Sequence, residues 1–267
     1  EQERKRKRIY YGFPSFDSIT KGLRPETVTV LAARPGVGKS AFAINLCSNL
    51  MDQKEKILYF SLEMSAFEQV SRLGALRTGI EFSNIYDALL NEKEMVLLTN
   101  FINDLGSTDS LLVCDNSSLT SEQISSIILE NQVSVVLIDF LQLCTFTTME
   151  NEVNRIGTFM KEIKKMSRDT RTAFFVLAQV NRMVEGRKEN FLKLSDLRDS
   201  GHIEQDADCV IFLTEEIPGD EGDQRIMRLS IAKNRNGARG RTLINFYPKT
   251  MRFTEKVIET RVEEVSF

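Results

Sequence analysis

The sequence has few of the residues that build metal centres, disulfide scaffolds and nucleophile systems. It contains one histidine, His202, and four cysteines, Cys47, Cys114, Cys144 and Cys209, none of which forms a C-x-x-C pair. The cysteines lie in apolar stretches, which is typical of buried free thiols in a reducing compartment. No cluster at metal-ligand spacing lies beside His202, and no serine–histidine–acid system is visible. The sequence therefore favours neither a zinc protein nor a serine hydrolase.

Long apolar runs and a strong charge imbalance are also missing. No apolar run reaches the roughly 20 residues that a membrane span needs, and no signal peptide is visible. We therefore expect a soluble cytoplasmic protein with no membrane partner. The net charge is −3, so any nucleic-acid site must be a local patch. The basic run at 4–8 fits either a solvated linker end or a contact with nucleic acid or a partner.

The remaining composition fits one large α/β domain. With 267 residues and 42% hydrophobic content, the chain can bury a sizeable core. Apolar runs alternate with segments whose apolar residues have helical spacing, which predicts a doubly wound, mostly parallel sheet. The expected strands are 27–33, 56–62, 110–115, 133–140, 172–180 and 207–214. Two more strands around the turn at 236–240 predict a hairpin, so the sheet should end antiparallel.

The stretch "ARPGVGKSA" (33–41) follows a predicted strand and opens a predicted helix. This is the context of a phosphate-binding loop, in which backbone N–H groups and a helix N-terminus face phosphate oxygens. Ala33 stands where the motif has its first glycine, and a methyl group should be tolerated there if φ is negative. The predicted nucleotide-binding residues are Ala33, Arg34, Pro35, Gly36, Val37, Gly38, Lys39, Ser40 and Ala41, with Lys39 on the β- and γ-phosphates and Ser40 on Mg²⁺.

Three further polar residues lie at predicted strand ends. Asp139 could hold the Mg²⁺ shell through water, or cap a helix. Glu63 could polarise an attacking water, or be an acid near the helix that begins at Ser65. Gln179 could sense a γ-phosphate, or be an ordinary strand-end amide. Since parallel strands present their ligands at one edge, together these groups favour nucleotide hydrolysis over binding alone.

The chain resembles the motor domain of DnaB-type replicative DNA helicases, which have a RecA-like ATPase fold. The resemblance rests on "ARPGVGKSAFAINL", "FSLEM", "LIDFLQL", "LAQVNRMVEGR", "LSDLRDSGHIEQDAD" and "IAKNRNGARG", and it runs from about Tyr11 to Phe253. It implies ATP and Mg²⁺ as cofactors, Glu63 as general base, Asp139 in the Mg²⁺ shell and Gln179 as sensor. It also implies that Ala at position 33 is common in the family.

The resemblance further implies a homo-hexameric ring with nucleotides between subunits. Lys233 and Arg235 would then reach the site of the next subunit, Arg235 as an arginine finger, although both could instead pair with surface acids. The ring would move on single-stranded DNA, with a helicase loader and a primase as partners. Since no aromatic platform is evident, we expect contacts with the DNA backbone. The predicted DNA-binding residues are Arg155, Arg182, Arg187, Lys188, Arg198, Asp199 and Gly201, most of them in expected loops at 181–190 and 197–206.

Domain organisation and three alternatives complete the prediction. Residues 1–12 are expected to end an interdomain linker and 13–267 to form the motor domain, with the N-terminal domain of a longer protein absent. A single motor domain could then be monomeric in solution. The alternative functions are a RecA-like strand-exchange ATPase, a P-loop phosphotransferase and an ATP-binding scaffold. The motifs at 195–208 and 232–237 favour the helicase over the first.

Overall fold

The structure is a computed structural model that describes residues 8–116, 119–139, 152–180, 192–197, 200–218 and 223–256. The helices are α1 (Pro14–Thr20), α2 (Lys39–Asp52), α3 (Ala66–Thr78), α4 (Phe82–Tyr86), α5 (Glu92–Gly106), α6 (Ser121–Glu130), α7 (Glu152–Asp169) and α8 (Ser200–Asp206), with short 3₁₀ turns η3 (Leu194–Asp196) and η4 (Pro248–Thr250). The strands are β1 (Val28–Ala33), β2 (Ile57–Ser61), β3 (Leu111–Cys114), β4 (Val135–Asp139), β5 (Ala173–Gln179), β6 (Cys209–Pro218), β7 (Arg225–Asn234), β8 (Gly240–Tyr247) and β9 (Arg252–Glu255).

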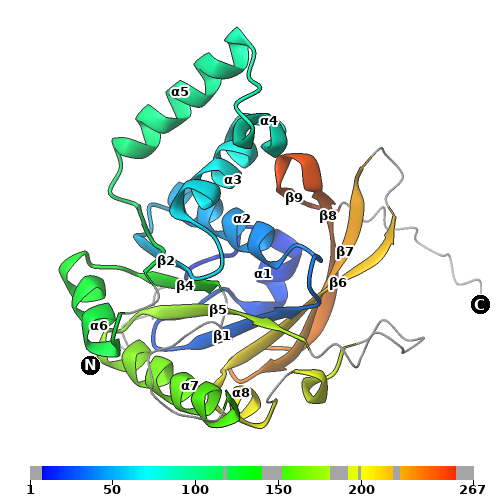
Figure 1. Ribbon diagram of the computed structural model, residues 1–267. Coiled ribbons are helices and arrows are strands. Elements are labelled where there is room, and N and C mark those ends of the chain that lie inside the picture. The colour runs from blue at the N-terminus through cyan, green and yellow to red at the C-terminus, as the bar shows by residue number, and fades with distance from the viewer. Residues whose placement is uncertain are drawn as a thin grey trace, which may run out of the picture.

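Within the described residues the strands form one sheet in the order β3-β2-β4-β5-β1-β6-β7-β8-β9. The strands from β3 to β6 in this order pair in parallel. From β6 onward neighbouring strands pair antiparallel, and β7 and β8 form the predicted hairpin. Figure 1 shows α6, α7 and α8 on one side of the sheet and α1, α2 and α3 on the other. The prediction of a mostly parallel sheet with an antiparallel C-terminal end is confirmed.

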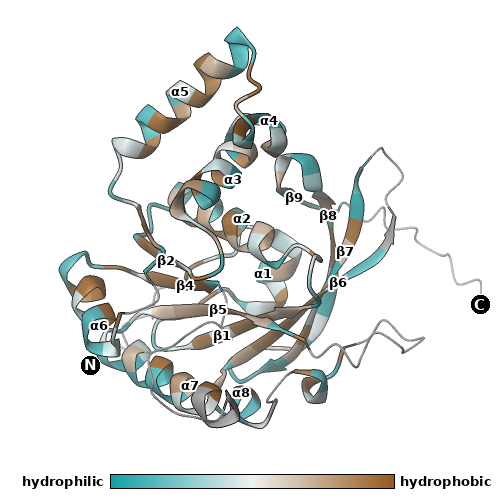
Figure 2. Ribbon diagram, in the orientation of Figure 1, coloured by the Kyte–Doolittle hydropathy of each residue, from teal (hydrophilic) through white to brown (hydrophobic). Residues whose placement is uncertain are grey.

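The central strands are apolar on both faces because helices cover both faces. All six residues of β1 are buried. Leu31 and Ala33 belong to the core that includes residues of α2, whereas Val30 and Ala32 belong to the core that includes residues of α6 and α7. Figure 2 shows this apolar character along β1, β4 and β5. Helix α5 differs, since none of its residues is buried and it extends away from the sheet in Figure 1.

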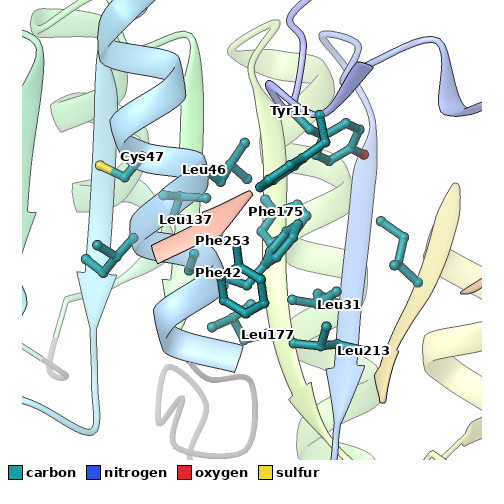
Figure 3. Packing of buried hydrophobic residues seen from close by; sticks show 14 of the residues in the cluster. Tyr11, Leu31, Phe42, Leu46, Cys47, Leu137, Phe175, Leu177, Leu213 and Phe253 are labelled. Carbon is teal, nitrogen blue, oxygen red and sulfur yellow. The ribbon is translucent and has the colours of Figure 1, made fainter. Parts of the chain in front are cut away.

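Aromatic packing joins α2 to the C-terminal strands. The ring of Phe42 stacks on Phe175 at 6.3 Å and meets Phe253 edge-on at 5.5 Å; these rings lie together in Figure 3. Asn45 on α2 donates a hydrogen bond to the carbonyl oxygen of Met251 (2.5 Å) and accepts one from the backbone N–H of Phe253 (2.8 Å). The last strands are therefore held over the helix that begins at the phosphate loop.

The N-terminal described residues pack into the same core. Ile9 and Tyr11 are each 1% exposed, and Ile9 pairs with Leu23 in an isolated β-bridge. The Asp17 carboxylate accepts hydrogen bonds from the backbone N–H groups of Tyr11, Gly12 and Phe13. Packing of the domain thus reaches at least to residue 9, within the range predicted to end a linker. Among the described helices, none combines the length and apolarity needed to span a bilayer.

Candidate active site

The segment between β1 and α2 has the geometry of an anion-binding loop. Gly36 and Gly38 adopt positive φ values of 74° and 108°, which residues with a Cβ rarely adopt. Gly38 is the N-cap of α2, and no side chain caps this helix. Because the first N–H groups of a helix lack partners within the helix, its N-terminus attracts phosphate oxygens. The loop predicted from the sequence is therefore present, with the helix behind it.

Ala33 fits its place at the start of the loop. It is the last residue of β1, is fully buried, and has no positive φ. It pairs in register with Gln179, the last residue of β5. A strand conformation imposes no need for glycine, so the methyl group is tolerated as expected.

A cavity of about 330 Å³ lies over this loop at the carboxyl ends of the strands. Lys39 and Ser40 line it from the start of α2, Glu63 from the segment after β2, and Gln179 from the end of β5. These elements follow or end strands of one parallel region of the sheet, which brings the predicted groups together. Ser65 is the N-cap of α3, and Glu63 precedes it at the exposed side of the cavity.

Asp139 lies behind this cavity at the end of β4 and is 1% exposed. The Tyr59 hydroxyl donates a hydrogen bond to its Oδ2 atom at 3.0 Å. Burial raises the pKa of Asp139, while hydrogen bonds from Ser40 and Tyr59 and the charge of Lys39 oppose this rise. Its Oδ1 atom is buried and has no hydrogen-bond partner among the described residues. A carboxylate oxygen without a partner beside a serine hydroxyl suits a hydrated divalent cation.

Lys39 is the cation that the phosphate loop brings to the cavity. Burial lowers its pKa, while the negative charges of Asp139 and Glu63 raise it in part. The ammonium group thus lies between two carboxylates in a partly desolvated place. A polyanionic ligand would add negative charge there and favour the charged form of Lys39.

Sequence reasoning missed several residues that line the same cavity. Arg225, Phe246, Pro248 and Met251 reach it from the C-terminal strands and the turn η4. A Cβ at Gly38 would lie 3.3 Å from Cε1 of Phe246, so the ring packs directly on the loop. No motif marks these residues, because they arrive through the folding of β8 and β9 over α2. An apolar wall of this kind suits an aromatic base.

Sequence reasoning also missed Arg72 on α3. It forms an ion pair with Glu68 at 2.8 Å, and its guanidinium lies 5.0 Å from the centre of the Phe82 ring. These contacts fix the side chain where it lines the cavity. The sequence shows only an arginine in a segment with helical spacing. That spacing does not indicate whether the side chain faces a binding site.

Lys233 and Arg235 lie at the opposite end of the parallel strands from the cavity, beside the first residues of β6. Strand β7 runs antiparallel to β6, so its first residue, Arg225, is near the cavity and its last residues are beside Cys209 and the start of β1. The ten residue-to-residue steps from Arg225 to Arg235 correspond to about 34 Å of strand. Arg235 therefore cannot reach the phosphate loop of its own chain, and its side chain is 48% exposed.

Most of the predicted DNA-binding residues lie outside the part of the chain that the structure describes. Arg182, Arg187, Lys188, Arg198 and Asp199 are outside the described residues, and Arg155 lies in α7 without a described side chain. Gly201 is exposed in the first turn of α8.

The predicted loop at 197–206 is wrong in part, because residues 200–206 are helical. His202 therefore lies on α8, where Nδ1 is buried without a hydrogen-bond partner among the described residues. No group of three potential metal ligands of the His, Cys, Asp and Glu types occurs in the described part of the chain. Of the described cysteines, Cys47 and Cys209 are buried free thiols and Cys114 is partly buried.

The fold and the cavity define a phosphate-loop α/β domain of the ATPase class. The profile of the DnaB-like helicase C-terminal domain family matches residues 9–255, and the chain belongs to that family. It is 32% identical over 249 residues to a probable plasmid replicative DNA helicase of Chlamydia muridarum, covering 91% of this chain and 54% of that protein. It is 31% identical over 262 residues to replicative DNA helicase DnaB of Geobacillus stearothermophilus, covering 95% of this chain and 57% of that protein.

Two solved structures have the same fold. One is described as a DnaB-like replicative helicase and its interactions with primase; it has a TM-score of 0.85 and 28% identity, covering 93% of this chain and 62% of that chain. The other is described as an ATPase domain; it has a TM-score of 0.85 and 27% identity, covering 96% of this chain and 93% of that chain. The chain thus spans little more than half of the relatives named above, and nearly all of an isolated ATPase domain.

Proposed function

We propose that this chain is the ATP-driven motor of a replicative DNA helicase, which moves on single-stranded DNA as a hexameric ring and unwinds duplex at the replication fork. The observation that carries the proposal is the arrangement of Lys39, Ser40, Glu63 and Gln179 around one cavity, while Arg235 is at the far end of the strands. Family membership supports the same activity. The protein would act in the cytoplasm of a bacterium or of a phage-infected host, with residues 13–267 as its motor domain.

The loop from Ala33 to Ala41 would hold the phosphates of ATP. Its glycines permit close approach of backbone N–H groups, and Lys39 supplies a positive charge to the β- and γ-phosphates. The base would lie against the apolar wall of Phe246, Pro248 and Met251, which line the same cavity. Arg72 lines it too and offers a second fixed cation for the triphosphate.

The residues present fit Mg²⁺. Ser40 would be a direct ligand through its hydroxyl, and Asp139 would bind a metal-bound water through Oδ1, the buried oxygen for which no partner is found among the described residues. When bound, the ion neutralises charge on the phosphate oxygens. Tyr59 holds Oδ2 of Asp139 at 3.0 Å and so orients the carboxylate toward Ser40.

Glu63 and Gln179 would act on the attacking water. Glu63 is exposed to the cavity after β2, where its carboxylate can accept the proton of a water placed beside the γ-phosphate. Gln179 ends β5 next to Ala33 and can report the presence of that phosphate to the rest of its strand. These roles require only that both side chains reach the same end of the triphosphate.

Arg235 would complete the site of a neighbouring copy. In its own chain it lies about 34 Å of strand away from Arg225 at the cavity, so a role in hydrolysis requires a second subunit. A guanidinium supplied in trans stabilises charge that develops on the transferred phosphoryl group. Lys233, on the same end of β7, would enter beside it. Repetition of this head-to-tail contact would build the hexameric ring.

DNA contacts would come from the segments that follow β5. An isolated bridge pairs Val180, the residue after Gln179, with Leu197. Arg182, Arg187, Lys188, Arg198, Asp199 and Gly201 would bind the DNA backbone there, with Arg155 as a further contact. A primase and a helicase loader would be the protein partners; the interaction with primase is described for the similar solved helicase.

The proposal is tested by ATP hydrolysis against protein concentration, with and without single-stranded DNA. We expect the rate per molecule to rise with concentration and with DNA, because each site needs two copies. Lys39→Ala should abolish nucleotide binding and hydrolysis. Arg235→Ala should bind nucleotide normally but lose about 10³-fold or more in kcat.

The matched control is Arg239→Ala, on the exposed β7–β8 turn. It removes a nearby positive charge and should leave hydrolysis unchanged. Activity that is independent of concentration, together with normal hydrolysis by Arg235→Ala, would refute a shared site. Strand exchange between homologous duplexes by the wild-type chain would instead indicate a recombinase.

A further inference from the structure

Asp208 is a buried carboxylate beside the base of Arg235. It lies between α8 and β6 and is 7% exposed. Its Oδ2 atom accepts hydrogen bonds from Lys164 Nζ at 2.5 Å and from the backbone N–H of Val28 at 2.8 Å. Its Oδ1 atom lies 3.7 Å from Nη1 of Arg235, and its carbonyl accepts the backbone N–H of Arg235 at 2.8 Å.

The two carboxylate oxygens of Asp208 have different partners, and these partners fix the orientation of the carboxylate. Oδ2 is held by Lys164 on α7 and by the first residue of β1, two elements of the rigid core. Lys164 is itself held, because its Nζ donates to the carbonyl of Glu26 at 3.2 Å. With Oδ2 fixed in this way, Oδ1 is directed at the guanidinium. Burying this charge is costly, and its cationic partners offset that cost.

The guanidinium has a second anchor at the end of α8. Nη2 of Arg235 donates to the carbonyl of Gln205 at 2.6 Å, and Nζ of Lys233 donates to the carbonyl of Glu204. Carbonyls at a helix C-terminus lack partners within the helix and attract cations. Burial lowers the pKa of Lys233, and the positive charge of Arg235 lowers it further, because the two cations lie close together. The buried negative charge of Asp208 thus offsets the repulsion between Lys233 and Arg235.

We infer that Asp208 is the positioning residue that holds Arg235 ready to enter the nucleotide site of the next copy. The inference rests on the proposed function, since it requires Arg235 to act in trans. Asp208 does not touch the nucleotide of its own chain, because it lies at the opposite end of β1 from the phosphate loop. Its contribution is to restrict the guanidinium, so that less conformational freedom is lost when the transition state forms.

The test is Asp208→Asn in the full chain. Asparagine retains an acceptor for Val28 and removes the charge that faces Arg235. We expect kcat for ATP hydrolysis to fall about 10- to 100-fold, with KM and nucleotide affinity unchanged. Asp52→Asn is the matched control, because it makes the same Asp-to-Asn change in another ion pair, with Arg77 at 2.9 Å, that has no contact with Arg235. It should leave kcat within about twofold of wild type.

A double-mutant cycle separates positioning from general damage. If Asp208 acts through Arg235, adding Asp208→Asn to Arg235→Ala should cause no further loss of kcat. A further loss equal to that of the single variant, or an unchanged kcat in Asp208→Asn, would overturn the inference. Should Asp208→Asn not fold, Asp208→Ser replaces it, because it also removes the charge, and an unchanged kcat in that variant has the same meaning. Normal hydrolysis by Arg235→Ala would refute the finger itself, a failure of the proposed function.

Discussion

At the scale of single residues, Asp139 shows a conflict between stability and function. Its carboxylate is buried, and Oδ1 has no partner among the described residues, so the charged form is poorly solvated without a ligand. Burial raises its pKa above the ordinary carboxyl value. The folded state then binds the proton more tightly than the unfolded state. Asp139 therefore lowers stability as pH rises from the ordinary carboxyl range through the raised pKa, and the loss is complete above it.

Asp139→Asn should consequently stabilise the ligand-free protein at neutral pH. Asparagine carries no charge and can still accept the hydrogen bond from Tyr59. We expect a higher urea midpoint than wild type at about pH 7 to 8, and a difference that disappears in acid. The same variant should lose about 10- to 100-fold in kcat, as expected for a residue that orients a metal-bound water. A urea midpoint below that of wild type at neutral pH would show that the Asp139 charge does not destabilise the ligand-free protein.

At the scale of elements, the positions of the strand ends were predicted best from the sequence. The helix expected to open at Lys39 spans Lys39–Asp52, and the strand ends at Ala33, Asp139 and Gln179 lie where alternation of apolar runs placed them. The reason is physical: a buried parallel strand is a continuous apolar run, and the first polar residue marks its end. Such ends share one edge of the sheet, so the cluster followed from the pattern without tertiary information.

The elements that sequence reasoning missed share a different origin. Phe246 and Met251 reach the cavity because β9 is tied to α2 through Asn45, whose two hydrogen bonds join residues far apart in the sequence. Arg72 points into the cavity because Glu68 and Phe82 hold it there. Periodicity assigns a residue to a helix face, but long-range contacts decide what that face meets. The sequence pattern therefore could not reveal the apolar wall or the positive charge that Arg72 adds to the cavity.

Strand β5 offers a test of coupling between the two proposed ligands. Gln179 lines the cavity, and the next residue, Val180, is bridged to Leu197 and hydrogen-bonded to the carbonyl of Ala33 at 3.2 Å. Gln179→Ala should therefore leave nucleotide affinity within about twofold of wild type but abolish the stimulation of hydrolysis by single-stranded DNA. Measuring DNA affinity in the same variant controls for damage to the loops. If Gln179→Ala kept full stimulation by DNA, Gln179 would not couple the nucleotide site to DNA binding.

At the scale of the whole molecule, the two parts of the proposed site lie at opposite ends of the strands. One end carries the phosphate loop and the cavity, and the other carries Arg235 with Asp208 and the end of α8. Strand β1 spans both, since Val28 contacts Asp208 and Ala33 begins the loop. If Arg235 acts in trans as proposed, each site is complete only where two copies meet head to tail. This is a stronger requirement than oligomerisation alone.

The requirement predicts complementation between two inactive chains. Lys39→Ala keeps a working Arg235, and Arg235→Ala keeps a working phosphate loop, so a contact between them rebuilds one intact site. Random mixing in equal amounts should make about a quarter of the contacts competent. ATP hydrolysis by the mixture should rise accordingly above the sum of the separate variants. The control mixes Lys39→Ala with a Lys39→Ala, Arg235→Ala double variant, where no intact site can form. A mixture as inactive as this control, although the chains assemble, would mean that Arg235 does not act across subunits.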